Sequence, residues 1–239
     1  MIMFSLLIGF TISHKPINVT TRNYTTIDNF NDLFKAMRDH FDSKNLTQDE
    51  FIKVTNSSAA NSSADYRLPV DCIARDPIEF YPERFVTAPT NSPNDEHHFT
   101  IDFLTSKVHL RNYTLLYITQ MRYMVQYEVL GELMENQWER IDYRAVDSRS
   151  MVKRFLVSGK TYYAYSFPTT ANKNYSRFRF RNIGVNQGLG VNQQNGFYTA
   201  TTAKLLLYGT LYPGRIAHSP IKLKRKEQML FNFAMFSSL

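Results

Sequence analysis

The sequence predicts a mainly β protein, an eight-stranded antiparallel jelly-roll or β-sandwich with an N-terminal helical extension. From His97 onward apolar and polar residues alternate, with Phe99, Ile101 and Phe103 on one side of the predicted strand. The glycines of this part fall mostly between the alternating stretches, where turns need them. Aromatic residues make up 14% of the chain, and Tyr and Phe favour half-buried, pleated surfaces. We therefore expect sheets rather than a helical bundle.

Eight stretches from His97 onward are candidate strands, separated by loops of uneven length. Strands are expected from His97 to Phe103 and at 107–118, 121–130, 137–145, 151–158, 160–167, 175–183 and 203–212. Eight such strands suit a closed barrel or a jelly roll, and periodicity alone does not separate a barrel from two stacked sheets.

The helical period is clearest at 26–42, where six apolar residues share one face. They are Ile27, Phe30, Leu33, Phe34, Met37 and Phe41. A capping-box pattern at Thr47 and Glu50 predicts a second, short helix through Val54. The stretch 55–65 has no apolar period and is expected to be a linker.

These patterns divide the chain into five segments. The divisions are an apolar N-terminal arm at 1–25, a helical segment and Ser/Ala/Asn linker at 26–65, a Pro-rich extended segment at 66–96, the jelly-roll domain at 97–212 and a basic C-terminal tail at 213–239. The apolar run that opens the arm is about a dozen residues long, short of the roughly 20 that span a bilayer as a helix. A membrane partner is not expected. Cys72 is the only cysteine, which excludes an intrachain disulfide and favours a reducing compartment.

Charge is distributed unevenly along the chain. Residues 1–96 carry 9 Lys and Arg against 13 Asp and Glu, whereas residues 97–239 carry 19 against 8. A positive field concentrated on the β part predicts contact with a polyanion, because Lys and Arg displace counterions from phosphates whatever the base sequence.

The sharpest local pattern is the alternation of arginine and phenylalanine from Arg177 through Arg179 to Arg181. A strand places the three guanidinium groups on one face and the two phenyl rings on the other. One interpretation is phosphate contact, since a row of guanidinium forks matches phosphate oxygens. The other is a solvated strand face paired with acidic residues of an adjacent strand or subunit. The tail carries a second basic cluster, formed by Lys222, Lys224, Arg225 and Lys226.

No motif predicts catalysis. A nucleophile elbow, a Walker loop, HExxH and a Rossmann fingerprint are all missing from the sequence. Adjacent His97 and His98 point to opposite faces of a strand and rarely share one metal ion. We predict a non-enzyme without cofactor, metal or small-molecule substrate, in which Trp138 is a strand or interface anchor.

The span from about 97 to 212 resembles the single-jelly-roll coat proteins of small viruses. Val152-Lys153-Arg154-Phe155 followed by Lys160-Thr161-Tyr162 resembles a basic and aromatic strand pair in coat proteins of small circular single-stranded-DNA viruses. A late apolar strand, Leu205 to Tyr212, follows here as it does there. Those proteins usually begin with an arginine-rich arm, whereas this chain begins with Met1-Ile2-Met3-Phe4. Genome contact would have to move to the Arg177–Arg181 strand or the Lys222–Lys226 tail.

The resemblance implies a structural coat subunit located in the virion. Its partners would be copies of itself or homologous shell subunits, with nucleic acid contacted through the basic strand and tail. Two alternatives stay open. One is a non-catalytic subunit of a large ribonucleoprotein or organellar complex, and the other is a jelly-roll surface glycoprotein, which would make the Asn-x-Ser/Thr sequons real. The sequons lie at Asn18, Asn23, Asn45, Asn56, Asn61, Asn112 and Asn174.

Overall fold

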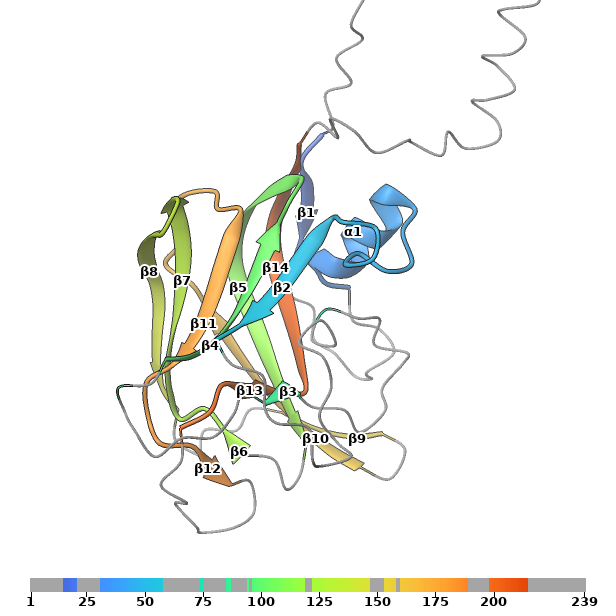
Figure 1. Cartoon of the computed structure of the whole chain (residues 1–239). Helices are drawn as coiled ribbons and strands as arrows, with labels where there is room; N and C mark the ends of the chain where they lie inside the picture. Colours follow the sequence, from blue (N-terminus) through green and yellow to red (C-terminus); the bar gives the residue numbers. More distant parts are fainter. Residues whose placement is uncertain are drawn as a thin grey trace, which may run out of the picture. The chain divides into compact units, whose positions relative to one another are not determined.

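The architecture is an antiparallel β-sandwich (Figure 1). The computed structural model of the 239-residue chain describes residues 15–20, 31–57, 74, 85–86, 94, 96–118, 122–146, 153–157, 160–188 and 198–214. All of them lie within one compact unit, His14–Gly214.

Two five-stranded sheets form the sandwich, and each contains only antiparallel pairs. The first sheet has the order β1 (Ile17–Val19), β14 (Lys204–Pro213), β5 (Ser106–Ile118), β10 (Lys160–Pro168) and β9 (Lys153–Val157). The second has the order β2 (Ile52–Asn56), β4 (His97–Phe103), β11 (Arg177–Asn182), β7 (Gln126–Met134) and β8 (Gln137–Ala145). Two short pairs complete the described strands, β12 (Gln187–Gly188) with β6 (Arg122–Tyr123) and β13 (Thr201–Thr202) with β3 (Phe85–Val86).

The predicted β-sandwich and its eight principal strands are confirmed. Each stretch predicted from His97 onward contains a strand, and 121–130 divides into β6 and the start of β7. The sandwich gains β2 and β1 as further members of its sheets. β1 belongs to the predicted apolar arm and pairs with β14, whereas residues 1–14 lie outside the described residues.

The helix predicted from Thr47 to Val54 is wrong, because residues 52–56 form β2 and pair with β4. The side chain of Asn45 accepts hydrogen bonds from the backbone N–H groups of Thr47 and Gln48, each at 3.2 Å, so this segment is a turn. Glu50 then takes a left-handed φ of 59°, which no α-helix interior accommodates.

One helix, α1 (Leu33–Phe41), occurs among the described residues. Asp32 caps its start by accepting a hydrogen bond from the Lys35 N–H at 2.9 Å, and Asp42 ends it in the left-handed conformation. Leu33, Phe34 and Met37 are buried, and α1 packs against β14 and β1. The helical period is therefore confirmed for 33–41. Residues 21–30 lie outside the described residues, and a longer helical extension is not shown.

Aromatic rings fill the space between the two sheets. Phe180 stacks on Phe99 with centroids 5.1 Å apart and meets Tyr113 of the opposite sheet edge-on at 5.4 Å. Phe103 contacts Phe178 at 5.9 Å and Phe34 of α1 at 6.3 Å. All six side chains are buried, so the hydrophobic effect and ring contacts together hold the layers.

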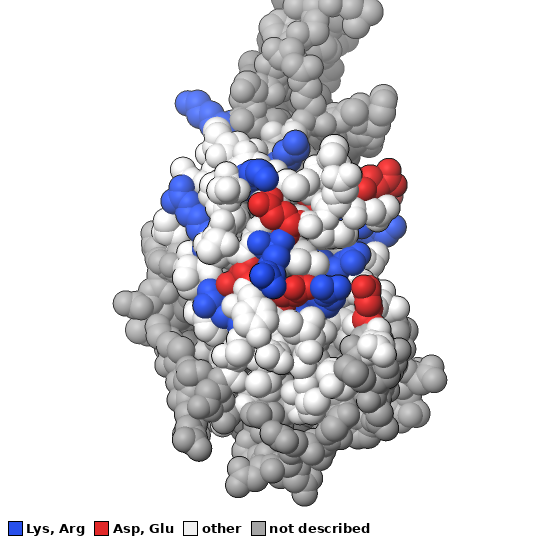
Figure 2. Space-filling view, turned by 90° about the vertical axis from the view of Figure 1, so that its left-hand side faces the viewer, with Lys and Arg blue, Asp and Glu red and all other residues white. Residues whose placement is uncertain are grey.

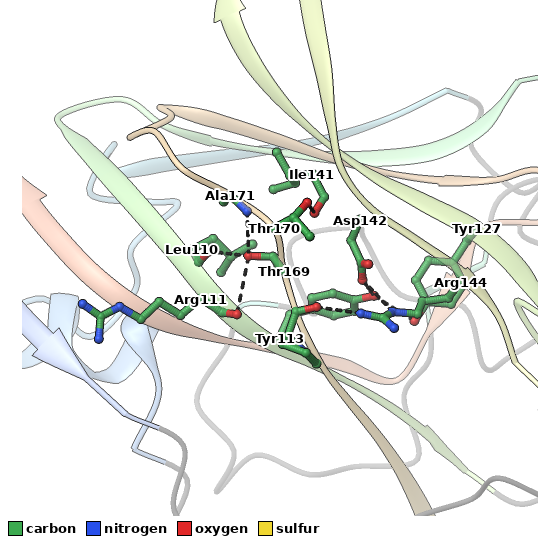
Figure 3. A network of polar contacts seen from close by, with 11 residues as sticks. Leu110, Arg111, Tyr113, Tyr127, Ile141, Asp142, Arg144, Thr169, Thr170 and Ala171 are labelled. Carbon is green, nitrogen blue, oxygen red and sulfur yellow. Dashed lines mark hydrogen bonds and ion pairs between the residues drawn. The ribbon is translucent and has the colours of Figure 1, made fainter.

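A polar network also crosses this core (Figure 3). The Tyr113 hydroxyl on β5 donates to Asp142 Oδ2 on β8 at 2.7 Å and lies 3.1 Å from the Tyr127 hydroxyl on β7. Arg144 donates from Nε to the same Asp142 oxygen at 2.8 Å and from Nη2 to the Pro168 carbonyl at 2.7 Å. Burial raises the pKa of Tyr113, so its hydroxyl keeps the donated proton. The buried carboxylate is thus bonded from both sheets.

The segment after β10 reinforces the same junction. Thr169 donates from Oγ1 to the Leu110 carbonyl of β5 at 2.5 Å, and Thr170 donates from Oγ1 to the Ile141 carbonyl of β8 at 2.8 Å. Figure 3 shows these two threonines beside the network. Consecutive residues therefore bridge the first sheet to the edge strand of the second.

Replacing Tyr113 by Phe tests the network. The change removes one hydroxyl and leaves Asp142 and Tyr127 each short of a buried partner, so we expect a loss of about 1–3 kcal/mol in the free energy of unfolding. Chemical denaturation followed by circular dichroism measures it. Tyr212→Phe, at an exposed position on β14, is the matched control. Equal stability of the two variants would show that the network contributes nothing.

Candidate functional site

The exposed side of the second sheet carries an array of polar and aromatic side chains. On β11, Arg177, Arg179 and Arg181 alternate with buried Phe178 and Phe180, so the arginines point away from the core. The strand pairing places their neighbours beside them. We call this set the outer face, and it comprises the three arginines with Lys53, Thr55, His98, Thr100, Asp102, Glu128, Leu130, Glu132, Trp138, Arg140 and Tyr143.

One row of the outer face is an ion-pair chain centred on Arg177. Its Nη1 donates to both oxygens of Glu132 on β7 at 2.6 and 2.8 Å. On the other side, Nε lies 3.5 Å from Asp102 Oδ2 on β4. Trp138 of β8 is opposite Glu132, and the Arg177 Cζ lies 5.4 Å from its ring centroid. This cation is matched by two carboxylates.

A second ion-pair row is centred on Arg181. Its Nε donates to Glu128 Oε1 at 2.6 Å, with a further close contact from Nη2, and Nη1 lies 3.5 Å from Glu96. Tyr143 of β8 is opposite Glu128. The Tyr143 hydroxyl accepts a hydrogen bond from Gln126 Nε2 at 3.0 Å. The sheet register sets Glu128 opposite Arg181, whereas Glu96 reaches it from the residue before β4.

The middle row, between these two, carries two arginines that have no acidic partner among the described residues. It runs from Thr100 through Arg179 and Leu130 to Arg140. Arg179 donates from Nε to Thr100 Oγ1 at 3.3 Å, and its Cζ lies 4.2 Å from the Trp138 ring centroid. Arg140 is exposed, with its Cζ 5.8 Å from the Tyr143 ring centroid. Among the residues that the structure describes, no carboxylate lies within ion-pair distance of either arginine.

A bulge in β8 decides which of its side chains reach this face. Val129 pairs with Asp142 but Leu130 pairs with Arg140, so Ile141 is an extra residue on β8. The bulge shifts the alternation by one residue. Arg140 and Tyr143 therefore share the outer face although they are three positions apart, while Asp142 points into the core.

Figure 2 shows the molecule from the side where β8 and β7 lie in Figure 1. Lys and Arg atoms lie beside Asp and Glu atoms in the middle of this view, with uncharged surface around them. The surface is a mosaic of both signs rather than a continuous positive field.

The predicted geometry of the arginine strand is confirmed, and the structure shows which of its arginines have acidic partners. Arg177 and Arg181 are paired with acidic residues of an adjacent strand, as one of the two interpretations held, whereas Arg179 is not. The second basic cluster, Lys222, Lys224, Arg225 and Lys226, lies outside the described residues. The sequence pattern missed Glu128, Glu132, Arg140 and Tyr143, because only the pairing of β7, β8 and β11 brings them to this face.

Two other features of the described residues concern metal and membrane. No group of three His, Cys, Asp or Glu side chains is placed to hold a metal ion in the part of the chain that the structure describes. Within that part, no helix has the length and hydropathy needed to cross a bilayer.

Comparisons with known proteins give structural matches of low identity. No protein-family model matches the sequence, and no curated protein matches it significantly. A Clostridium perfringens structure, CpGH89CBM32-5 in complex with GalNAc-β-1,3-galactose, matches with 16% identity over 67% of this chain and 97% of that one, with a TM-score of 0.42. CBM32-3 from a family 31 glycoside hydrolase of the same organism matches with 12% identity, 67% and 92% coverage and a TM-score of 0.44. The family 32 CBM of C. perfringens NanJ in complex with galactose matches with 10% identity, 67% and 95% coverage and a TM-score of 0.42.

The prediction of a viral coat subunit is wrong. The three matching structures named above are carbohydrate-binding modules, not coat proteins. The predicted partners, copies of a shell subunit and nucleic acid, are overturned with it. Charge explains part of the error, because two of the three arginines expected to meet a genome already have carboxylate partners on the outer face.

His98, at the end of the Arg181 row, makes stability depend on pH. Burial, with the nearby Arg179 and Arg181 charges, lowers its pKa from 6.5 to about 4, against an opposing effect of Glu96. Nδ1 lies 3.6 Å from Glu96 Oε2, too far for a hydrogen bond. Between pH 6.5 and about 4, His98 binds a proton in the unfolded chain but not in the folded chain. The free energy of unfolding therefore falls as pH falls.

Replacing His98 by Gln should remove this component. Between pH 6.5 and about 4 the wild-type protein should lose up to about 3 kcal/mol more than the variant. Urea denaturation at several pH values measures the free energy of unfolding of both proteins. Subtracting one from the other removes the contribution of titrating groups that both proteins share. Parallel stability curves would contradict the assignment.

Proposed function

We propose that this chain is a non-catalytic β-sandwich that binds carbohydrate on the outer face. One observation carries the proposal. Two aromatic side chains, Trp138 and Tyr143, lie on the same side of β8, beside a lattice of polar groups that the sheet already holds in place. Tyr143 is 43% exposed and Trp138 is half-buried.

The chemistry of a sugar matches both parts of this surface. A pyranose ring offers a C–H face that packs on an aromatic ring, and hydroxyl groups that donate and accept hydrogen bonds. The outer face offers rings from β8, guanidinium donors from β11 and carboxylate acceptors from β7. An amphipathic surface of this kind suits a ligand with alternating apolar and polar sides.

The polar groups are also ordered before any ligand arrives. Glu132 is held by Arg177, Glu128 by Arg181, and the Tyr143 hydroxyl by Gln126. Groups already fixed lose little conformational freedom on binding, so more of the contact energy is expressed as affinity. From β4 to β8 the face spans three strand spacings, about 14 Å, which gives room for more than one sugar ring.

Binding without hydrolysis is favoured by the state of the carboxylates. Asp102 and Glu132 lie on either side of Arg177 in the same row. Glycoside hydrolysis needs an acid and a second carboxylate with the sugar between them. Here the Arg177 side chain lies between the two groups and contacts both.

Tyr143→Ala tests the proposal at its most exposed ring. We expect the dissociation constant for a bound oligosaccharide to rise about 3- to 10-fold through loss of ring contact. A glycan array of neutral and acidic oligosaccharides finds the ligand, and isothermal titration calorimetry measures the change. Tyr212→Ala on the other sheet is the control, since Tyr212 has similar exposure at 36%. The proposal fails if no oligosaccharide binds, or if the control variant loses affinity as much as Tyr143→Ala.

A further inference from the structure

The middle row of the outer face has a positive charge that no carboxylate of the described residues balances. Resting on the proposed function, we infer that the bound sugar carries a carboxylate, as a uronic acid does, and that Arg179 and Arg140 hold it. The ligand is thus an acidic rather than a neutral oligosaccharide.

Arg179 is positioned for this role by its neighbours. Its Nε is bonded to Thr100, and its guanidinium lies against the Trp138 ring. Nη1 and Nη2 have no hydrogen-bond partner among the residues that the structure describes. The guanidinium is therefore fixed in orientation, with its two terminal donors available to an incoming acceptor.

Arg140 supplies the second cation from the other side of Leu130. The two arginines are on β11 and β8, two strands apart with β7 between. Their backbones are therefore about 10 Å apart, and arginine side chains are long enough to converge on one group above Leu130. Leu130 offers no polar group of its own to compete.

The charges of the flanking rows do not cancel these two cations. Glu132 and Asp102 are committed to Arg177, and Glu128 and Glu96 to Arg181. Burial lowers the pKa of Arg179, and the attraction of Glu96 and Glu132 only partly opposes this effect. A bound anion would relieve that cost.

A carboxylate fits better than a spherical anion. Two planar carboxylate oxygens match the parallel N–H donors of a guanidinium fork. A carboxylate borne on a pyranose ring also places the ring next to the aromatic residues that bracket the middle row. One acidic sugar can thus contact both the arginines of the middle row and the aromatic residues beside it.

The test compares two tetrasaccharides by calorimetry on the full chain. One alternates glucuronic acid with N-acetylglucosamine, and the other contains N-acetylglucosamine alone. We expect the acidic tetrasaccharide to bind at least about tenfold more tightly, with an advantage that falls as salt rises. Arg179→Gln and Arg140→Gln should each remove most of this preference. Arg111→Gln makes the same charge change on β5 of the other sheet, where Arg111 is exposed, and should alter the preference less than about twofold.

The possible failures are distinguishable. Arg140 is exposed, so its variant stays folded even if Arg179→Gln does not. Equal binding of both tetrasaccharides, unchanged in the Arg140 variant, overturns this inference and leaves the proposed function standing. A sulfated tetrasaccharide without carboxylates that binds as tightly as the acidic one also overturns it. Binding of no tetrasaccharide, and of no other glycan, overturns the proposed function itself.

Discussion

The outer face depends on the inward orientation of the Asp142 carboxylate. Tyr113 from the first sheet and Arg144 from β8 both donate to it, and a buried carboxylate without such donors is costly. With Asp142 held in the core, the bulge at Ile141 lets Arg140 and Tyr143 both point outward. The polar network inside the sandwich thereby determines what its surface presents.

The second constraint is electrostatic. A net charge of +7 suggests a basic surface, yet the strands of the second sheet bring acidic and basic side chains together. Glu132 lies 45 residues from Arg177 in the sequence, and Glu128 lies 53 from Arg181. Pairing at such separations neutralises Arg177 and Arg181 on β11 and leaves Arg179 and Arg140 of the middle row without an ion-pair partner among the described residues.

Local patterns predict a strand best where one of its faces is buried and the other is not, because burial then imposes the period of two on side chains. The Arg177–Arg181 strand is the clearest case. The hairpin of β9 and β10 coincides with the basic and aromatic pattern that resembled viral coat proteins. That pattern therefore encodes an antiparallel hairpin, which many unrelated β-sandwiches contain.

The errors arose where tertiary contacts override local preference. Thr47 and Glu50 have the spacing of a capping box, but pairing of Ile52 and Val54 with β4 makes the following segment a strand. The bulge at Ile141 has no sequence signal, since a regular period would send Arg140 and Asp142 to the same face. The middle row could not be predicted from the sequence either, because its members come from four strands that only the folded sheet brings together.

Backbone amide shifts in two-dimensional NMR, recorded during titration with the acidic tetrasaccharide, test the location of binding most directly. Binding on the outer face predicts that the largest shifts fall on β8 and β11, around Arg140, Tyr143 and Arg179. Shifts confined to β5, β10 and β14 of the opposite sheet would contradict it.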